Sequence, residues 1–372
     1  MRAALWHGNG RHVEVDDVNL PAPGPHEVVV DTTAVVACIT DVIAFDNPPF
    51  PPGAHIPQIP GHGGVGIVSA VGSDVSRVRV GDTVLGSANP WCGVCYACLR
   101  DRPDMCGELT FLGPEIELAP TGSTVAHSYL GSYAEQMLTR EIQVVPLTTG
   151  ISHQALAVLA DGGAGGVGGA FNVAPVTAGA SVAVVGCGMT GLAYLQSARV
   201  LGAETIIAID PLTHRRELAE KFGATHTFDA NDPDLVEKVK EVAGSYPALF
   251  GDKRGVEFAF EAAGDASAMG TAMAITRPTG HVVLASVTKD FLTATLPISA
   301  FDAAMNGKQI HGCQWGQTNL LRDIPLWTRL LERGELDFDS MVSTTVGLDA
   351  IDGVLDQVAA CEVVAAVVEP RQ

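Results

Sequence analysis

The residues VAVVGCGMTGLA (182–193) decide how the second half of the chain folds. A run of apolar β-formers leads into Gly186, Gly188 and Gly191, and a helix-like segment follows at once, so a buried strand is expected to turn into a helix across a G-x-G-x-x-G loop. Further strand-like and helix-like segments then alternate at 205–210, 213–223, 255–264, 267–277 and 280–287. This alternation predicts an α/β region with a doubly wound parallel sheet.

The first ~150 residues show a different pattern of apolar segments and turns. Short β-rich segments separated by proline and glycine clusters predict an irregular, mostly β domain. These segments are 2–6, 12–18, 27–37, 63–72 and 82–87. The end of the chain returns to helix-like segments at 324–336 and 348–362 and a short strand at 363–370. The length of 372 residues is sufficient for two domains.

Composition excludes several classes of function. Apolar residues make up 47% of the chain and charged residues 17%, which favours a well-packed globular enzyme over a disordered chain. A net charge of -20 argues against binding to nucleic acid or to an anionic membrane surface. No window predicts a membrane span, and the start MRAALWHGNGRHVEV turns polar within eight residues. We therefore expect a cytoplasmic protein.

The glycine loop at 186–191 has the surroundings of a dinucleotide site. Asp210 ends the next strand, nineteen residues beyond Gly191, where a carboxylate can accept hydrogen bonds from ribose hydroxyls and repel a 2′-phosphate. The sequence therefore predicts NAD rather than NADP. Arg215 either lies along the adenosine or is a solvated helix charge. The predicted cofactor-binding residues are Gly186, Gly188, Met189, Thr190, Gly191, Asp210 and Arg215.

A dense cysteine cluster lies in the β-rich region. CGVCYACLRDRPDMC places four thiols as C-x2-C-x2-C-x7-C, at Cys92, Cys95, Cys98 and Cys106. Four thiolates can close a tetrahedral shell around Zn²⁺ and leave no position for water or substrate, which predicts a structural zinc site. An iron–sulfur cluster and four free thiols are the alternatives.

With these motifs, the chain resembles the zinc-dependent alcohol dehydrogenases of the medium-chain dehydrogenase/reductase superfamily. The likeness covers nearly the whole chain. It includes PAPGPHEVVV (21–30), GHGGVGIVSAVGSDVSRVRVGDTV (61–84), the cysteine cluster, GSYAEQM (131–137) and the glycine loop. It implies a GroES-like, mostly β catalytic domain at 1–162 and 315–372, with the cysteine lobe at 90–107. A Rossmann NAD-binding domain would take 163–314.

The resemblance also implies a second, catalytic zinc held by Cys38, His62 and Asp161. Asp161 lies twenty-five residues before Gly186, as the family pattern requires, in the glycine-rich ADGGAGGVGGAF (160–171). One thiolate, one imidazole and one carboxylate would leave a fourth position open for an alcohol or carbonyl oxygen. Taken singly, the three residues could instead be a core cysteine, a buried turn histidine and a helix cap. The glycines are expected to keep bulk away from the metal and the nicotinamide where the chain crosses between domains.

Two neighbours of Cys38 take catalytic roles by the same resemblance. Thr40 would take the proton from the alcohol, and Asp41 would orient the ligand histidine. The alternative for both is ordinary turn hydrogen bonding.

Three positions depart from the family pattern. Ile39 replaces a basic residue near the cofactor phosphates, Gly63 replaces the glutamate of the GHE motif, and Ile43 lies where some members have a histidine that ends the proton relay. Candidates for the substrate pocket are Phe111, His127 and Tyr129.

The leading prediction is an NAD-dependent zinc alcohol dehydrogenase (EC 1.1.1.-) that interconverts an alcohol and an aldehyde or ketone with two zinc ions per chain. The first alternative retains NAD for a redox-neutral dismutation, epimerisation or elimination. The second is a non-catalytic zinc- and nucleotide-binding protein. The resemblance implies a homodimer or homotetramer that pairs near 296–301 and 309–315.

Overall fold

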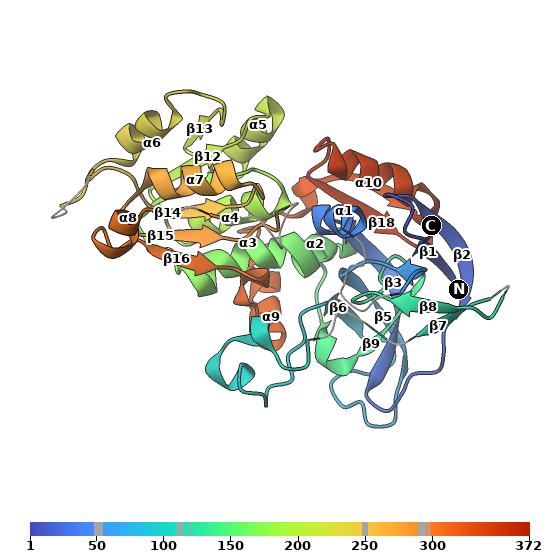
Figure 1. Ribbon diagram of the computed structural model, residues 1–372. Coiled ribbons are helices and arrows are strands. Elements are labelled where there is room, and N and C mark those ends of the chain that lie inside the picture. Colours follow the sequence, from blue (N-terminus) through green and yellow to red (C-terminus); the bar gives the residue numbers. More distant parts are fainter. Residues whose placement is uncertain are drawn as a thin grey trace. The chain divides into compact units, whose positions relative to one another are not determined.

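The computed structural model describes residues 1–47, 55–109, 113, 115–119, 121–247, 252–288, 295–296 and 298–372. The chain divides into two compact units (Figure 1). The first contains Met1–Gly162, Asn319–Gly334 and Phe338–Gln372. The second contains Gly163–Thr318 and Glu335–Asp337.

The second unit is built on a parallel sheet in the order β13-β12-β11-β14-β15-β16. The strands are β11 (Ser181–Val185), β12 (Thr205–Ile209), β13 (His226–Phe228), β14 (Val256–Glu261), β15 (Thr276–Leu284) and β16 (Gln309–Gly312). Every residue of β11 is buried, as expected for a strand with helices on both faces. The order reverses at β11, and in such sheets ligands bind beyond the carboxyl ends of the strands at that point. The predicted doubly wound sheet is confirmed.

Helices connect these strands. They are α4 (Met189–Val200), α5 (Thr213–Lys221), α6 (Leu235–Ala243), α7 (Ala266–Ile275) and α8 (Ala300–Ala304). In Figure 1, α7 lies against β14 and β15. Side chains from α6 and α7 meet those of β11, β12 and β14 in one buried apolar cluster, which fixes the helices to the sheet.

The glycine-rich segment after Asp161 is helical, although glycine is a poor helix former. Residues Ala164–Gly168 form α3, and a π-helical turn follows at Gly169–Val173. A Cβ built on Gly166 would lie 2.5 Å from Thr190 O, and one on Gly169 would lie 2.2 Å from the Tyr194 hydroxyl. These glycines therefore permit close packing of α3 and the following turn against α4.

Near residue 316, the second unit is also packed through a close contact between glycines. A Cβ on Gly168 would lie 2.4 Å from Gly316 O, and Asn172 Nδ2 donates to the same oxygen at 3.3 Å. Gly316 therefore belongs to the second unit, which continues to Thr318 rather than stopping at residue 314.

The first unit contains a closed barrel and a larger mixed sheet. The barrel strands are β1 (Arg2–Trp6), β2 (Val13–Asn19), β4 (Gln58–Ile59), β7 (Ile116–Leu118) and β8 (Thr124–His127). The larger sheet runs β10-β6-β5-β3-β18-β17, with β9 also paired to β3. Its strands are β3 (Glu27–Ala37), β5 (Gly63–Val71), β6 (Thr83–Ser87), β9 (Gln136–Arg140), β10 (Val144–Leu147), β17 (Val342–Gly347) and β18 (Ala365–Glu369). The mostly β character predicted for this region is confirmed.

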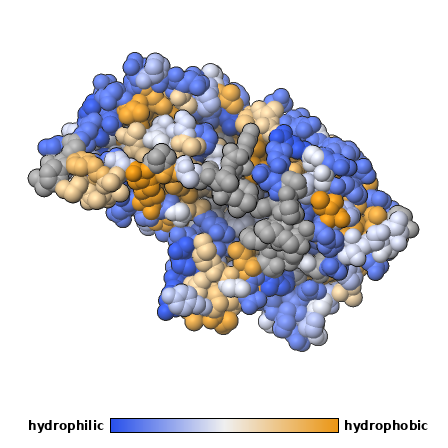
Figure 2. Space-filling model, in the orientation of Figure 1, coloured by the Kyte–Doolittle hydropathy of each residue, from blue (hydrophilic) through white to orange (hydrophobic). Residues whose placement is uncertain are grey.

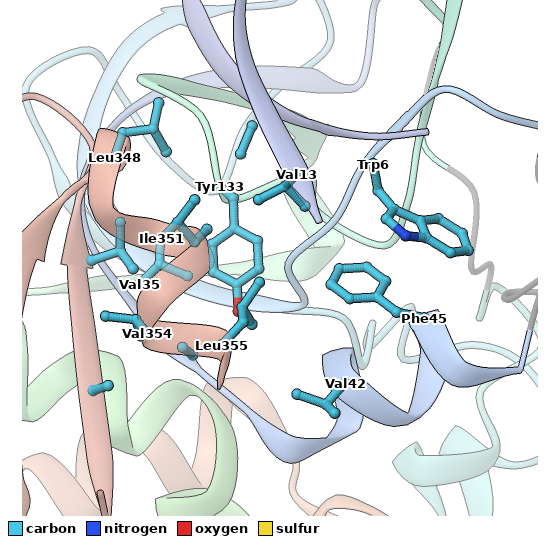
Figure 3. Close-up of a cluster of buried hydrophobic side chains, with 14 residues drawn as sticks. Trp6, Val13, Val35, Val42, Phe45, Tyr133, Leu348, Ile351, Val354 and Leu355 are labelled. Atoms are coloured by element: carbon cyan, nitrogen blue, oxygen red, sulfur yellow. The ribbon is translucent and has the colours of Figure 1, made fainter. Parts of the chain in front are cut away.

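The helices of the first unit are α1 (Ile39–Asp46), α2 (His153–Val158), α9 (Leu320–Glu332) and α10 (Ile351–Ala359). α1 was not expected from the sequence, and a capping box explains its start. Cys38 Sγ accepts from Thr40 N, while the Asp41 carboxylate accepts from Cys38 N. The buried face of α1 packs in an apolar cluster with β1, β3 and α10, in which the Trp6 and Phe45 rings stack (Figure 3).

Hydrophilic residues cover much of the face shown in Figure 2, with smaller apolar areas between them. None of the helices in the described part of the chain is long and apolar enough to cross a membrane.

Candidate functional site

Three potential metal ligands meet in the first unit. Cys38 is the residue that caps α1 after β3, His62 immediately precedes β5, and Asp161 lies in a π-helical turn, Leu159–Gly163, that follows α2. One ligand atom from each residue lies within 4.8 Å of the other two. The exposed fractions are 7%, 3% and 6%, so all three groups are withdrawn from bulk water.

His62 bridges two carboxylates. Its Nδ1 donates to Asp41 Oδ1 at 3.0 Å, and its Nε2 lies 3.2 Å from Asp161 Oδ1. The second oxygen of Asp161, Oδ2, is buried and has no hydrogen-bond partner among the described residues. A buried carboxylate oxygen without a donor is costly unless a cation binds it.

The charges of this cluster favour a cation. Burial disfavours the charged form of His62, but Asp41 and Asp161 outweigh burial and hold its pKa well above the usual value. Burial and the neighbouring charge of Asp161 raise the pKa of the Cys38 thiol to about 11. For Asp161 burial opposes ionisation, yet the His62 charge keeps its pKa below the ordinary value.

The three side chains fit zinc. Thiolate, imidazole and carboxylate are its usual ligands, and a three-ligand set is typical of catalytic zinc sites. A divalent cation would stabilise the Cys38 thiolate and replace the proton that His62 Nε2 shares with Asp161. Because Asp41 accepts a hydrogen bond from His62 Nδ1, Nε2 is the ring nitrogen that can face a metal. A carboxylate commonly orients a ligand histidine in this way.

Four thiols form a second cluster in the first unit. Cys92 Sγ and Cys98 Sγ lie 3.9 Å apart, and Cys95 Sγ and Cys106 Sγ lie 4.0 Å apart. Sulfurs around a tetrahedral zinc at about 2.3 Å are separated by about 3.8 Å, so the cluster has the size of a closed zinc shell. Backbone N–H groups of Gly107 and Cys98 lower the pKa of Cys95 to about 6, whereas burial raises the pKa of Cys98 to about 12 and also raises that of Cys106.

The glycine loop of the second unit has the form that a dinucleotide requires. Gly186 has φ +96°, and a Cβ on Gly191 would lie 1.9 Å from Gly186 O, so both positions need glycine. Gly188 caps α4, whose first turn contains Met189 and Thr190. The N-terminus of α4 therefore presents backbone N–H groups where an anion can approach.

The acid after β12 is tied to this loop. Asp210 Oδ2 accepts from Cys187 N, and Oδ1 accepts from Leu212 N, each at 2.8 Å. Because a carboxylate has about four lone-pair positions, these bonds leave acceptor capacity for a ribose. Arg215 Nη1 lies 3.9 Å from where a Cβ on Gly188 would stand, so this guanidinium borders the loop.

Comparison with known proteins identifies the family. The model "Alcohol dehydrogenase GroES-like domain" matches residues 24–149, and the model "Zinc-binding dehydrogenase" matches residues 190–333. Alcohol dehydrogenase 6 of Rattus norvegicus is 30% identical over 353 residues, which cover 92% of this chain and 90% of the relative. The chain belongs to the zinc-dependent alcohol dehydrogenases of the medium-chain superfamily. It is therefore an oxidoreductase, as predicted.

Solved structures of this family have the same fold. An alcohol dehydrogenase zinc-binding domain protein from Burkholderia ambifaria has a TM-score of 0.90 at 25% identity and covers 99% of this chain and 98% of its own. A zinc-binding dehydrogenase from Sinorhizobium meliloti, solved with NADP bound, has a TM-score of 0.77 at 26% identity, with 99% of each chain covered.

The departures from the alcohol dehydrogenase pattern have structural consequences. A Cβ on Gly63 would lie 3.0 Å from Ala160 O, so the backbone before Asp161 occupies the space beside Gly63. Ile43 is buried, whereas Ile39 is 41% exposed at the start of α1. Gly63 therefore supplies no carboxylate, and Ile43 supplies no imidazole that could carry a proton.

The predicted pocket residues differ in their surroundings. The Tyr129 ring lies 5.7 Å from the His62 ring, beside the candidate metal centre. The His127 ring is buried, and Cβ atoms on Gly113 and Gly131 would both collide with it. Phe111 lies outside the described residues.

Sequence reasoning missed one residue of this site. The Tyr133 hydroxyl donates to Asp41 Oδ2 at 2.5 Å. Tyr133 lies in GSYAEQM (131–137), a segment that served only to indicate the family. Because Tyr133 and Asp41 are 92 positions apart in the sequence, their contact could not be predicted from a local pattern.

Proposed function

We propose that this chain is an NAD-dependent zinc alcohol dehydrogenase that interconverts an alcohol and an aldehyde or ketone. The convergence of Cys38, His62 and Asp161, with a buried carboxylate oxygen that lacks a donor, is the observation that supports this proposal. Bound at these three residues, zinc supplies Lewis acidity toward the substrate oxygen. A second zinc in the four-cysteine lobe would be structural.

In this proposal, two residues near Cys38 accept or hold protons during the reaction. Thr40 Oγ1 lies 3.5 Å from Cys38 Sγ, which supports its role as the group that accepts the proton of the alcohol hydroxyl. Asp41 keeps the proton of His62 on Nδ1, so that Nε2 is free to ligate. Because Ile43 cannot carry a proton, the proton in this proposal leaves Thr40 through water or through another residue.

The second unit binds the cofactor in this proposal. The N-terminus of α4 takes the pyrophosphate, and Asp210 accepts from the ribose hydroxyls. A carboxylate at this position repels a 2′-phosphate, which supports NAD over NADP, although the Sinorhizobium meliloti relative was solved with NADP. Arg215, at the edge of the loop, would then lie along the adenosine.

The test is a panel of primary, secondary and benzylic alcohols, assayed with NAD and NADP beside zinc analysis. We expect reduced cofactor to accumulate with NAD and two zinc ions per chain. Asp161→Ala should hold one zinc and lose activity, whereas Asp16→Ala, a change of an exposed carboxylate, should match the wild type. Full activity and two zincs in Asp161→Ala would refute the ligand assignment.

The same panel separates the alternatives. Substrate turnover without net NADH would indicate a redox-neutral reaction on retained NAD. One zinc per chain without turnover would indicate a binding protein. We further propose a homodimer or homotetramer, measurable by light scattering, that acts in the cytoplasm, where the eight cysteines, none of them in a disulfide, would remain reduced.

A further inference from the structure

Tyr133 brings one hydroxyl into an apolar core. Its side chain is 0% exposed and packs with Val13, Ile351 and Leu355 (Figure 3). The backbone around it is fixed, because Tyr133 O accepts from Ala4 N at 2.8 Å. A phenylalanine ring would fill the same apolar space, so packing alone does not account for the hydroxyl.

Among the described residues, the hydroxyl forms its hydrogen bond with Asp41, the carboxylate that also accepts from His62. Tyr133 Oη donates to Asp41 Oδ2 at 2.5 Å, a short bond of the kind that charged acceptors form. Cys38 N donates to the same oxygen at 3.3 Å, and His62 Nδ1 donates to the other oxygen at 3.0 Å. Asp41 is only 4% exposed, so these donors replace water around it.

Tyr133 remains a donor in this setting. Burial raises its pKa well above the usual value, and the Asp41 charge adds to this effect, so the phenol stays protonated. Of the two donors to Asp41 Oδ2, the phenol is the nearer by a clear margin. Its loss would leave a buried carboxylate oxygen with one long bond and freedom to rotate.

We propose that Tyr133 is a positioning residue of the metal centre, whose hydroxyl holds Asp41 in the orientation that fixes the His62 ring for metal binding. The inference rests on the proposed zinc site at Cys38, His62 and Asp161. It adds an outer layer to that site: Tyr133 orients Asp41, Asp41 orients His62, and His62 Nε2 ligates. Outer partners of this kind typically change metal affinity or activity by about 10–100-fold.

The test compares Tyr133→Phe with the wild type as full-length, zinc-loaded protein. We expect zinc to pass from the catalytic site to a chromogenic chelator about tenfold faster in Tyr133→Phe. After replacement of this zinc by Co²⁺, the visible absorption bands should shift, because the His62 ring is less well held. Tyr194→Phe removes another fully buried hydroxyl, 3.4 Å from Cys313 Sγ in the second unit, and should leave both readings unchanged.

A double-mutant cycle distinguishes positioning from a general effect on packing. In an Asp41→Asn background, Tyr133→Phe should change the release rate much less than in the wild type. The same tenfold effect in both backgrounds, or wild-type release and spectrum in Tyr133→Phe, would overturn the proposal. Asp161→Ala identifies the zinc being followed: if it releases zinc as the wild type does, the catalytic site itself is wrongly assigned, which is a separate failure.

Discussion

At the scale of single residues, the side chains that start α1 also belong to the candidate metal centre. Cys38 caps the helix and Asp41 returns a bond to Cys38 N, which orders a short turn of backbone. That turn places Thr40 Oγ1 beside Cys38 Sγ. A helix cap thus determines where a candidate ligand, its neighbouring hydroxyl and the carboxylate on His62 stand relative to one another.

Thr40 is the residue with the most direct prediction for activity. Thr40→Val should lower kcat by about 10²-fold or more, because it removes the hydroxyl that we propose accepts the proton while the side-chain shape is kept. Thr40→Ser retains a hydroxyl and should stay within a few-fold of the wild type. Steady-state kinetics with NAD and zinc analysis check both variants. Equal loss in both variants would exclude the proton role.

His127 predicts a pH dependence of stability. Burial lowers its pKa to about 4, whereas in the unfolded chain the value is about 6.5. As pH falls below about 6.5, His127 therefore binds a proton in the unfolded chain but not in the folded protein. The free energy of unfolding consequently declines until about pH 4, where the folded protein also binds this proton. The decline due to this residue should be about 2 kcal/mol or more between pH 7 and pH 4.5.

His127→Asn is the matched variant, because asparagine does not titrate. Its stability should be lower than that of the wild type at pH 7, and the difference should shrink as pH falls. Urea unfolding at several pH values measures both proteins. Parallel pH profiles would show that His127 is not held neutral.

At the scale of elements, α3 shows how packing overrides propensity. A segment this rich in glycine is a poor helix former in isolation. Close packing against α4 stabilises the helical state, and glycine is needed at Gly166 and at Gly169 in the turn that follows because a Cβ there would collide with α4. The strands of the second unit, by contrast, follow directly from their continuous apolar runs.

Gly166→Ala should therefore destabilise the protein despite the higher helix propensity of alanine. Its Cβ would meet the Thr190 carbonyl oxygen at 2.5 Å, a backbone atom that cannot rotate away, and we expect a loss of about 1–3 kcal/mol. Gly270→Ala in α7 is the control, since no atom lies within 4 Å of its Cβ, and should be neutral or gain about 0.5–1 kcal/mol. Chemical unfolding measures both, and equal behaviour of the two variants would contradict the packing argument.

At the scale of the whole molecule, two metal sites are expected to differ in exchange. In the proposed function, the four cysteines would close a thiolate shell around one zinc, whereas Cys38, His62 and Asp161 would form an open, mixed shell around the other. A chelator should therefore remove one zinc quickly and the second slowly. Asp161→Ala should lack the fast phase, and Cys98→Ala should lack the slow phase.

Zinc removal should also lower global stability. A ligand that binds only the folded state stabilises it by about 4 kcal/mol at about 1,000 times its Kd. Loss of both ions should thus lower the midpoint of thermal unfolding, and added zinc should restore it. Calorimetry with and without chelator provides the measurement, and an unchanged midpoint would argue against a structural zinc in the lobe.

The sequence alone determined the features that depend on neighbours in the chain. The apolar strands, the glycine loop and the tight cysteine spacing are local, so the parallel sheet, the cofactor loop and the lobe could be predicted from composition and spacing. The family resemblance added Cys38, His62 and Asp161 as ligands, an assignment that stays a prediction.

Only the tertiary structure decided which distant groups meet. His62 and Asp161 are 99 positions apart, and Tyr133 and Asp41 are 92 apart, yet each pair is hydrogen-bonded in a buried site. No local pattern encodes such contacts, because they arise when sheet and helices fold together. The helical state of the glycine-rich segment has the same origin: its stability lies in close contact with α4, which the segment itself does not contain.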